Sequence, residues 1–119
     1  MSPTLVSLEG EPVYALGGAG GPTIISQTVL HLILMIDFGL TPEQALAHPR
    51  LHHQWSPDQV VLEEGWPASV IEGLRDKGHD VRIVPSLGVS QIVARPDKEG
   101  SLQALSDPRV KGSGMAYTP

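Results

Sequence analysis

The segment from Pro22 to Phe38 constrains the fold of this chain more than any other part of the sequence. Pro22 suits the start of a helix, because its missing N–H would have no partner there, and Gly39 suits the residue just after a helix end. On a helix, the apolar side chains of this segment cover most of the circumference. The main exceptions are polar residues at i, i+4 spacing: Thr23, Gln27 and His31. Such a helix is buried on most sides, so we expect a sheet or other helices around it.

The remaining segments predict further helices and a series of short strands. Residues 41–44 match a capping box with proline in the first turn, and Pro49 ends that helix early. An amphipathic helix is expected over residues 67–77, closed by Gly78. Strands are expected at residues 4–8, 12–16, 51–55, 60–63, 81–84, 89–94 and 102–105, with a polar loop at 96–100. This order favours an α+β fold with helices layered on an antiparallel sheet.

Composition excludes several classes of protein. The chain has no cysteine, which excludes disulfides, thiol nucleophiles and Cys₄ zinc sites. Its formal charge of −5 argues against a nucleic-acid partner, since phosphate binding needs clustered Lys and Arg. The most apolar run, residues 29–35, is interrupted by His31 and is much shorter than the ~20 residues that span a bilayer. We therefore expect no membrane span, and the first residues lack the pattern of a targeting segment.

A glycine-rich stretch from Gly17 to Gly21 joins a predicted strand to the long helix. Backbone N–H groups at a helix N-terminus have partial positive charge, and glycine allows a ligand to approach the backbone closely. The stretch is therefore a candidate cradle for an anion or an oxyanion, or else a tight turn that needs positive φ. It is not a P-loop, because no Gly-Lys-Ser/Thr follows, and Thr23 stands where a Rossmann motif has its third glycine.

Other polar residues allow more than one interpretation. His48 and His52 have the i, i+4 spacing of metal ligands on a helix, but Pro49 favours a packed, hydrogen-bonded strand over 52–55, His53 included. Arg109 could bind a substrate carboxylate or, as we prefer, fix the chain by pairing with an acidic neighbour. Ser90 and Gln91 fall on a predicted strand without an assigned role. No Gly-x-Ser-x-Gly or other nucleophile motif is found.

A set of short motifs runs in order through nearly the whole chain. They are Met1-Ser2-Pro3-Thr4, Gly17-x-x-Gly20-Gly21, Pro49-Arg50-x-His52-His53-Gln54-Trp55, Ser106-Asp107-Pro108-Arg109 and residues 114–117. Together they resemble the C-terminal part of the small subunit of γ-glutamyltranspeptidase. The resemblance implies part of the αββα sandwich of an N-terminal-nucleophile hydrolase. Residues 1–119 would then be a single partial domain, whose partners are the rest of the small subunit and the large subunit.

The resemblance also implies an activity for the parent enzyme, γ-glutamyl transfer and glutathione hydrolysis. A threonine upstream of this chain would attack γ-glutamyl amides such as glutathione, and the acyl-enzyme would react with water, amino acids or dipeptides. Gly20 and Gly21 match the paired glycines whose N–H groups form the oxyanion hole of the family. Ala19 replaces the proline that the family has before this pair. The family implies no cofactor and no metal, and a periplasmic or extracellular location.

Two alternatives remain open at this point. The parent could be a related acylase that acts on another acyl group, such as a β-lactam side chain. The chain could also be a non-catalytic module that binds a small anion or a partner chain. If the chain is instead a fragment of a γ-glutamyltransferase, we expect the isolated chain to be inactive. The roles of His52, His53 and Arg109, and the balance between hydrolysis and transfer, are left undetermined.

Overall fold

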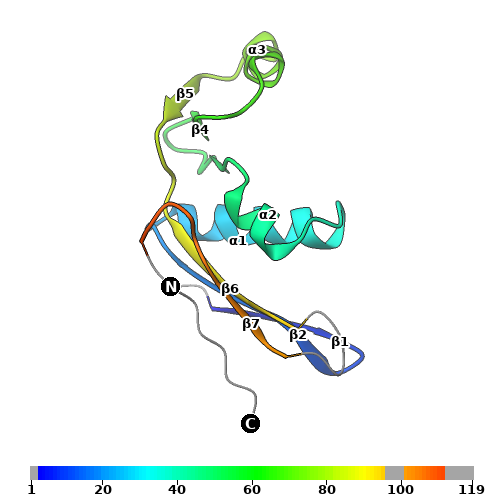
Figure 1. The fold of residues 1–119 in the computed structure, drawn as a ribbon. Coiled ribbons are helices and arrows are strands. Elements are labelled where there is room, and N and C mark those ends of the chain that lie inside the picture. Colours follow the sequence, from blue (N-terminus) through cyan, green and yellow to red (C-terminus); the bar gives the residue numbers. More distant parts are fainter. Residues whose placement is uncertain (1–2, 96–100, 112–119) are drawn as a thin grey trace.

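The computed structural model describes residues 3–95 and 101–111, so the loop predicted at 96–100 and the motif residues 1–2 and 114–117 lie outside the described parts. The elements are β1 Thr4–Leu8, β2 Glu11–Ala19, α1 Thr23–Ile36, α2 Pro42–Ala47, β3 Leu51–His52, β4 Val60–Glu63, α3 Ala68–Asp76, β5 Val81–Val84, β6 Val89–Ala94 and β7 Gln103–Ser106. Figure 1 shows α1 and α2 lying over one sheet, with β4, β5 and α3 in a lobe at one end.

The larger sheet has the strand order β1-β2-β6-β7, and all its neighbouring strands are antiparallel. Its inner face packs against α1 and α2 through a core of buried apolar side chains. These are Leu16, Leu34, Met35, Ala45, Leu46 and Ile92. The expected α+β class, with helices layered on an antiparallel sheet, is confirmed.

The smaller sheet has the order β3-β4-β5 and contains a pairing that was not expected. β4 and β5 are parallel, with Val60 opposite Val81 and Glu63 opposite Val84. A parallel pair requires a crossover, which α3 provides between the two strands. The expectation of a purely antiparallel sheet is therefore wrong for this lobe.

The side of α1 that carries its polar line is buried. Gln27 and His31 are 2% and 0% exposed, so its polar line faces the interior. An apolar stripe faces outward instead and consists of Ile25, Val29, Ile33 and Ile36. Burial on most sides is thus wrong for this chain, because the sheet covers one face of the helix and the described residues leave the opposite face open.

The shape is extended for the length of the chain. The radius of gyration is 15.5 Å and the extents are 51 × 29 × 24 Å, whereas a compact chain of this length has a radius of about 13.5 Å. The outer face of the larger sheet is lined by Leu5, Ala15, Val93 and Ala104 at successive paired positions, with Leu5 70% exposed. No described helix is both long enough and apolar enough to cross a membrane.

Candidate functional site

The glycine stretch is part strand and part turn. β2 continues through Gly17 and Gly18, which pair with β6, and ends at Ala19. The turn itself is therefore shorter than expected, because long-range pairing with β6 extends the strand. Gly20 and Gly21 make this turn with φ of +144° and +60°, which side chains rarely adopt. α1 begins directly after it, with Pro22 as its N-cap.

The Gly20–Gly21 peptide group has a defined direction. The Gly20 carbonyl oxygen accepts hydrogen bonds from the Thr23 N–H at 3.3 Å and from Thr23 Oγ1 at 2.9 Å. This peptide is trans, so the Gly21 N–H points opposite to that carbonyl, away from the helix. No described residue accepts a hydrogen bond from the N–H of Gly20 or Gly21. Both glycines are exposed, so their donors are available to an anion at the positive end of α1.

Gln27 fills the space beneath this turn. Its Nε2 donates to Thr23 Oγ1 at 2.9 Å and makes a longer contact of 3.5 Å with the Ala19 carbonyl oxygen. Its Oε1 accepts from Ser90 Oγ at 2.8 Å. The Thr23–Gln27 spacing indicates a polar line in the sequence, but this role of Gln27 was not predicted from it. The signal available was a pair of polar residues on an otherwise apolar helix.

Behind Ser90 lies a buried ion pair. The Ser90 N–H donates to Asp107 Oδ2 at 2.7 Å, and the same carboxylate binds the Arg50 guanidinium. Arg50 Nη1 also donates to the carbonyl oxygens of Leu87 and Gly88, at 3.0 and 2.9 Å. The pair thus connects the end of β7 to the loop that precedes β6.

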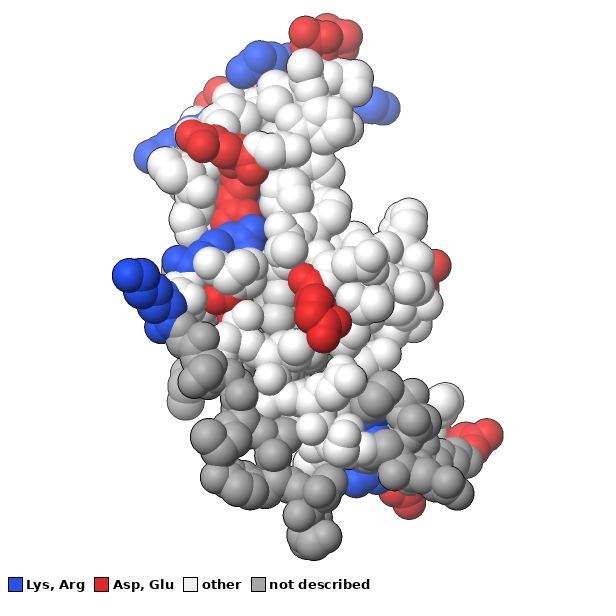
Figure 2. All heavy atoms as spheres, in the orientation of Figure 1, with Lys and Arg blue, Asp and Glu red and all other residues white. Residues whose placement is uncertain are grey.

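A second ion pair completes this network. Arg109 Nη2 binds Glu63 Oε2 at 2.5 Å, and Arg109 Nη1 binds Asp107 Oδ1 at 3.2 Å. Arg109 also donates to the carbonyl oxygens of Leu46 and His48, at 2.7 and 2.9 Å. In Figure 2, acidic and basic atoms lie together where the lobe of β4, β5 and α3 meets the rest of the molecule. The structural interpretation of Arg109, pairing with acidic neighbours, is confirmed.

The network keeps its carboxylates charged. Burial opposes ionisation of Asp107, but hydrogen bonds from Arg50 and from the N–H groups of Arg109 and Ser90 outweigh burial and lower its pKa. Burial likewise opposes ionisation of Glu63, and hydrogen bonds from Arg109 and from the Leu87 and Arg50 N–H groups lower its pKa below the usual value. Two guanidinium groups and two carboxylates therefore neutralise one another inside the protein.

The histidines have different surroundings. Burial lowers the pKa of His31 to about 4, with Arg50 adding to the effect, and neither ring nitrogen has a partner among the described residues. His52 is bonded through Nδ1 to Ser26 Oγ at 2.7 Å and through Nε2 to Gln54 Oε1 at 2.9 Å. The exposed His53 lies 3.1 Å from Asp58 Oδ1.

The predicted strand at 51–55 is only partly present. β3 ends at His52, and Trp55 has φ +70° and is 82% exposed. Hydrogen bonding of His52 is confirmed, whereas packing of Trp55 is wrong, because the described residues leave its ring uncovered. Among the described residues, no group of three His, Asp or Glu side chains is placed to hold a metal.

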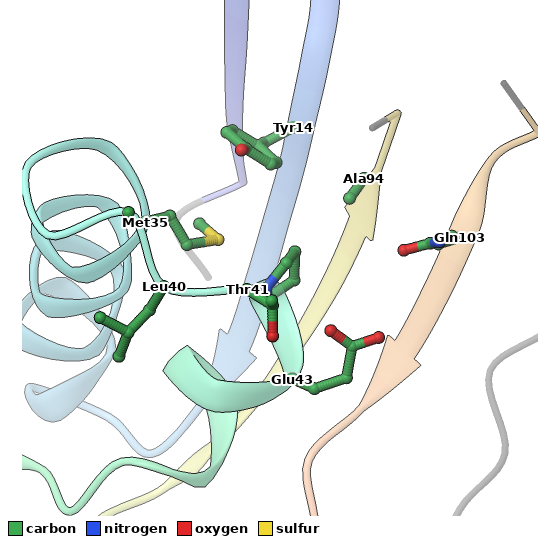
Figure 3. A pocket seen from close by; sticks show the side chains of 9 residues that line it. Tyr14, Met35, Leu40, Thr41, Glu43, Ala94 and Gln103 are labelled. Carbon is green, nitrogen blue, oxygen red and sulfur yellow. The ribbon is translucent and has the colours of Figure 1, made fainter. Parts of the chain in front are cut away.

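A recess on the described surface is remote from the glycine turn. It measures about 420 Å³ and lies between the end of α1, the start of α2 and the sheet. Figure 3 shows Tyr14, Met35, Glu43 and Gln103 around it. Tyr14 and Gly20 are separated by six residues of nearly continuous strand, or about 20 Å. The recess therefore does not form one site with the glycine amides.

Comparisons with known proteins identify similar chains. The family model described as gamma-glutamyltranspeptidase matches residues 1–117. A glutathione hydrolase proenzyme of Escherichia coli is 37% identical over 110 residues, which make up 92% of this chain and 19% of that protein. The chain thus spans about a fifth of the length of such curated relatives.

Solved structures give the same result for the fold. A γ-glutamyltranspeptidase of Pseudomonas nitroreducens superposes with a TM-score of 0.88 at 30% identity, covering 99% of this chain and 62% of that one. A cephalosporin acylase of Bacillus halodurans superposes with a TM-score of 0.87 at 27% identity, covering 98% of this chain and 22% of that one. The expected N-terminal-nucleophile hydrolase fold is confirmed.

Proposed function

This chain belongs to the γ-glutamyltranspeptidase family, and we propose that it is part of an enzyme that hydrolyses glutathione and transfers γ-glutamyl groups. The observation that supports this proposal best is the pair of exposed glycine N–H groups at the head of α1, for which no acceptor is found among the residues that the structure describes. Gly20 and Gly21 would be the oxyanion-hole donors. The nucleophile, a threonine, would belong to a part of the polypeptide outside this chain.

The proposed reaction needs such donors at one defined moment. The threonine hydroxyl attacks the γ-carbonyl carbon, its proton passes to the α-amino group of that threonine, and the carbonyl oxygen becomes an oxyanion. Collapse of this intermediate breaks the C–N bond, and the proton leaves with the departing amine. Water or an amino acid then attacks the ester and regenerates the hydroxyl. Donors 2.7–3.1 Å from the oxyanion stabilise both intermediates.

The uncovered apolar surfaces support the proposal that residues 1–119 are a partial domain. Leu5 is 70% exposed on the outer sheet face, and the Ile25 stripe is exposed on one side of α1. In an αββα sandwich a second sheet packs on such a face. We propose that the rest of the small subunit and the large subunit cover these surfaces. A periplasmic or extracellular location is proposed on family grounds.

A related acylase is the second candidate, because the Bacillus halodurans cephalosporin acylase superposes as closely as the transpeptidase does. Both activities would use the same oxyanion donors, and the acyl group would be selected by residues outside this chain. Parallel assays of the full-length polypeptide on γ-glutamyl-p-nitroanilide and on a glutaryl-β-lactam distinguish the two. Cleavage of the β-lactam substrate alone would contradict γ-glutamyl specificity.

A matched pair of glycine variants tests the oxyanion assignment. Gly21 and Gly39 have φ of +60° and +68°, and at both an added Cβ meets no atom within 4 Å. Gly21→Ala and Gly39→Ala should therefore cost similar stability, about 1 kcal/mol. In the full-length polypeptide only Gly21→Ala should lower kcat, by about 100-fold, because the variant keeps its N–H but its Cβ would obstruct the close approach of the oxyanion to the backbone. Equal kcat in the two variants would overturn the assignment.

The isolated chain should have no turnover, because it supplies donors without a nucleophile. Purified residues 1–119 are incubated with γ-glutamyl-p-nitroanilide, and release of the chromophore is followed. A rate above the buffer blank would contradict the proposed division of the active site.

A further inference from the structure

We infer that Gln27 is a positioning residue, whose buried amide sets the direction of the glycine N–H groups at the head of α1. The inference rests on the proposed function of Gly20 and Gly21, and extends it to a residue that touches neither substrate nor oxyanion. In this inference the Gln27 side chain, which belongs to α1, fixes the orientation of the two glycine N–H groups.

Gln27 acts on the turn through the Thr23 hydroxyl. That hydroxyl has one proton, which it donates to the Gly20 carbonyl oxygen at 2.9 Å. It is free to do so because Gln27 Nε2 donates to the hydroxyl oxygen, also at 2.9 Å. The Gly20 carbonyl is thereby held inward, and the Gly21 N–H of the same planar peptide is turned outward.

The preceding peptide is oriented by the same amide. Gln27 Nε2 lies 3.5 Å from the Ala19 carbonyl oxygen, a contact at the outer limit of hydrogen bonding. The Ala19 carbonyl and the Gly20 N–H belong to one trans peptide and point in opposite directions. One side chain therefore contacts the Ala19 carbonyl oxygen directly and reaches the Gly20 carbonyl oxygen through the Thr23 hydroxyl, and the N–H groups of these two peptides would bind the oxyanion.

The Gln27 amide has no room to turn away. A Cβ on Gly20 would lie 3.0 Å from Nε2, and a Cβ on Gly88 would lie 2.1 Å from it. Glycine backbone therefore encloses the amide on two sides. Its oxygen is fixed by Ser90 Oγ, and Ser90 is fixed in turn by its N–H bond to the buried Asp107 carboxylate. The Ala19 carbonyl oxygen can only accept a hydrogen bond, so the amide nitrogen and not the amide oxygen faces the turn.

The test compares variants of similar volume in the full-length polypeptide that contains residues 1–119, assayed on γ-glutamyl-p-nitroanilide. Gln27→Met removes the amide, and Gln59→Met is the control, since the Gln59 side chain donates to the exposed Asp80 carboxylate at 2.6 Å, outside the glycine turn. We expect kcat to fall about 10- to 100-fold in Gln27→Met with KM within about threefold, and no change in Gln59→Met. Native kcat in Gln27→Met would overturn the inference.

Gln27→Glu gives a readout that a merely structural role would not produce. An ionised carboxylate would draw the Thr23 proton away from the Gly20 carbonyl, whereas a protonated carboxyl would donate as the amide does. Burial raises the pKa of such a carboxyl, so kcat relative to the native enzyme should recover as pH falls. A ratio that does not vary with pH would contradict the inference, even where Gln27→Met fails to fold.

Thr23 supplies a rescue experiment. Thr23→Val removes the hydroxyl and should lower kcat as Gln27→Met does. Thr23→Ser keeps the hydroxyl and should have a kcat close to the native value. If the proposed function is wrong, Gly21→Ala matches Gly39→Ala in kcat. If only the role of Gln27 is wrong, Gly21→Ala is impaired while Gln27→Met and Thr23→Val keep native kcat.

Discussion

Arg50 and Asp107 form an ion pair in which both side chains are 0% exposed. Arg50 directly precedes β3, and Asp107 directly follows β7, so the pair joins the small sheet to the last strand of the large one. The same Asp107 oxygen accepts the Ser90 N–H at 2.7 Å, one step from Gln27. The ion pair therefore supports the framework behind the glycine turn as well as the junction of the lobes.

Removing one member of this pair should be costly. Asp107→Asn leaves the Arg50 charge buried without its partner, and we expect the free energy of unfolding in urea to fall by about 3–5 kcal/mol. The exposed pair of Arg95 and Glu11, separated by 3.5 Å, is the control. Glu11→Gln should change stability by less than about 1 kcal/mol. Equal losses in the two variants would contradict the importance of burial.

His31 should make stability depend on pH. Its pKa is about 4 in the folded chain against an ordinary value of 6.5, so the unfolded chain binds the additional proton between these values. The contribution of His31 to the free energy of unfolding is therefore present in full above pH 6.5. It is lost as pH falls toward 4, by about 3 kcal/mol. The neighbouring charges of Arg50, Asp107, Arg109 and His48 contribute to the His31 pKa.

The pH effect is measured as the difference between native and His31→Gln chains in urea unfolding from pH 7.5 to 4. The native chain should lose more stability than the variant, and the exposed His79→Gln should follow the native curve. Asp107 and Glu63, with lowered pKa values, add a loss in the same direction below about pH 5 in all these chains. Parallel curves for native and His31→Gln would contradict the prediction.

Ser26 and His52 should stabilise the contact between α1 and β3. Gln54 Nε2 donates to the Ser56 carbonyl oxygen at 3.0 Å, which points Gln54 Oε1 at His52 and assigns the proton of the ring to Nε2. Ser26 then donates to Nδ1. Ser26→Ala should lower the free energy of unfolding by about 1–3 kcal/mol, and ¹⁵N NMR should show the Nε2–H tautomer. A loss no larger than in the exposed Ser69→Ala would contradict this role.

The outward stripe of α1 should make the isolated chain associate. Ile25 and Val29 are 65% and 50% exposed, and a large apolar patch of this kind marks an interface. Sedimentation should show mass rising with concentration, and Ile25→Glu with Val29→Glu should reduce it. The control is a variant with Ser69→Glu and Glu72→Gln, two substitutions on the exposed side of α3. Concentration-independent monomer in the native chain would contradict the prediction.

The features predicted correctly from sequence depend on local chemistry. The capping box is present, with the Thr41 N–H donating to Gln44 Oε1 at 2.9 Å and the Gln44 N–H donating to Thr41 Oγ1 at 3.3 Å. Gly78 directly follows the C-cap of α3 with φ of +89°, as expected, whereas α1 ends at Ile36 and Gly39, with φ of +68°, lies two residues beyond its C-cap Asp37. A glycine or a cap acts within one helical turn, so neighbouring residues suffice to predict it.

The features that sequence did not reveal depend on residues far apart in the chain. Gly17 and Gly18 resemble a turn until β6 pairs with them. The polar line of α1 has no assigned partner in the sequence, and its partner Ser90 is 63 residues away from Gln27. Glu63 was overlooked because a carboxylate at a strand end is ordinarily solvated, and here Arg109 lies against it.

The apolar stripe on the outer side of α1 sets a limit on engineering of this chain. Polar substitutions along the outer stripe would make the fragment more soluble and easier to purify. Under the proposed assembly they would also remove the surface through which it joins the rest of the enzyme. A screen that selects for soluble expression of this segment alone would therefore enrich variants that no longer assemble.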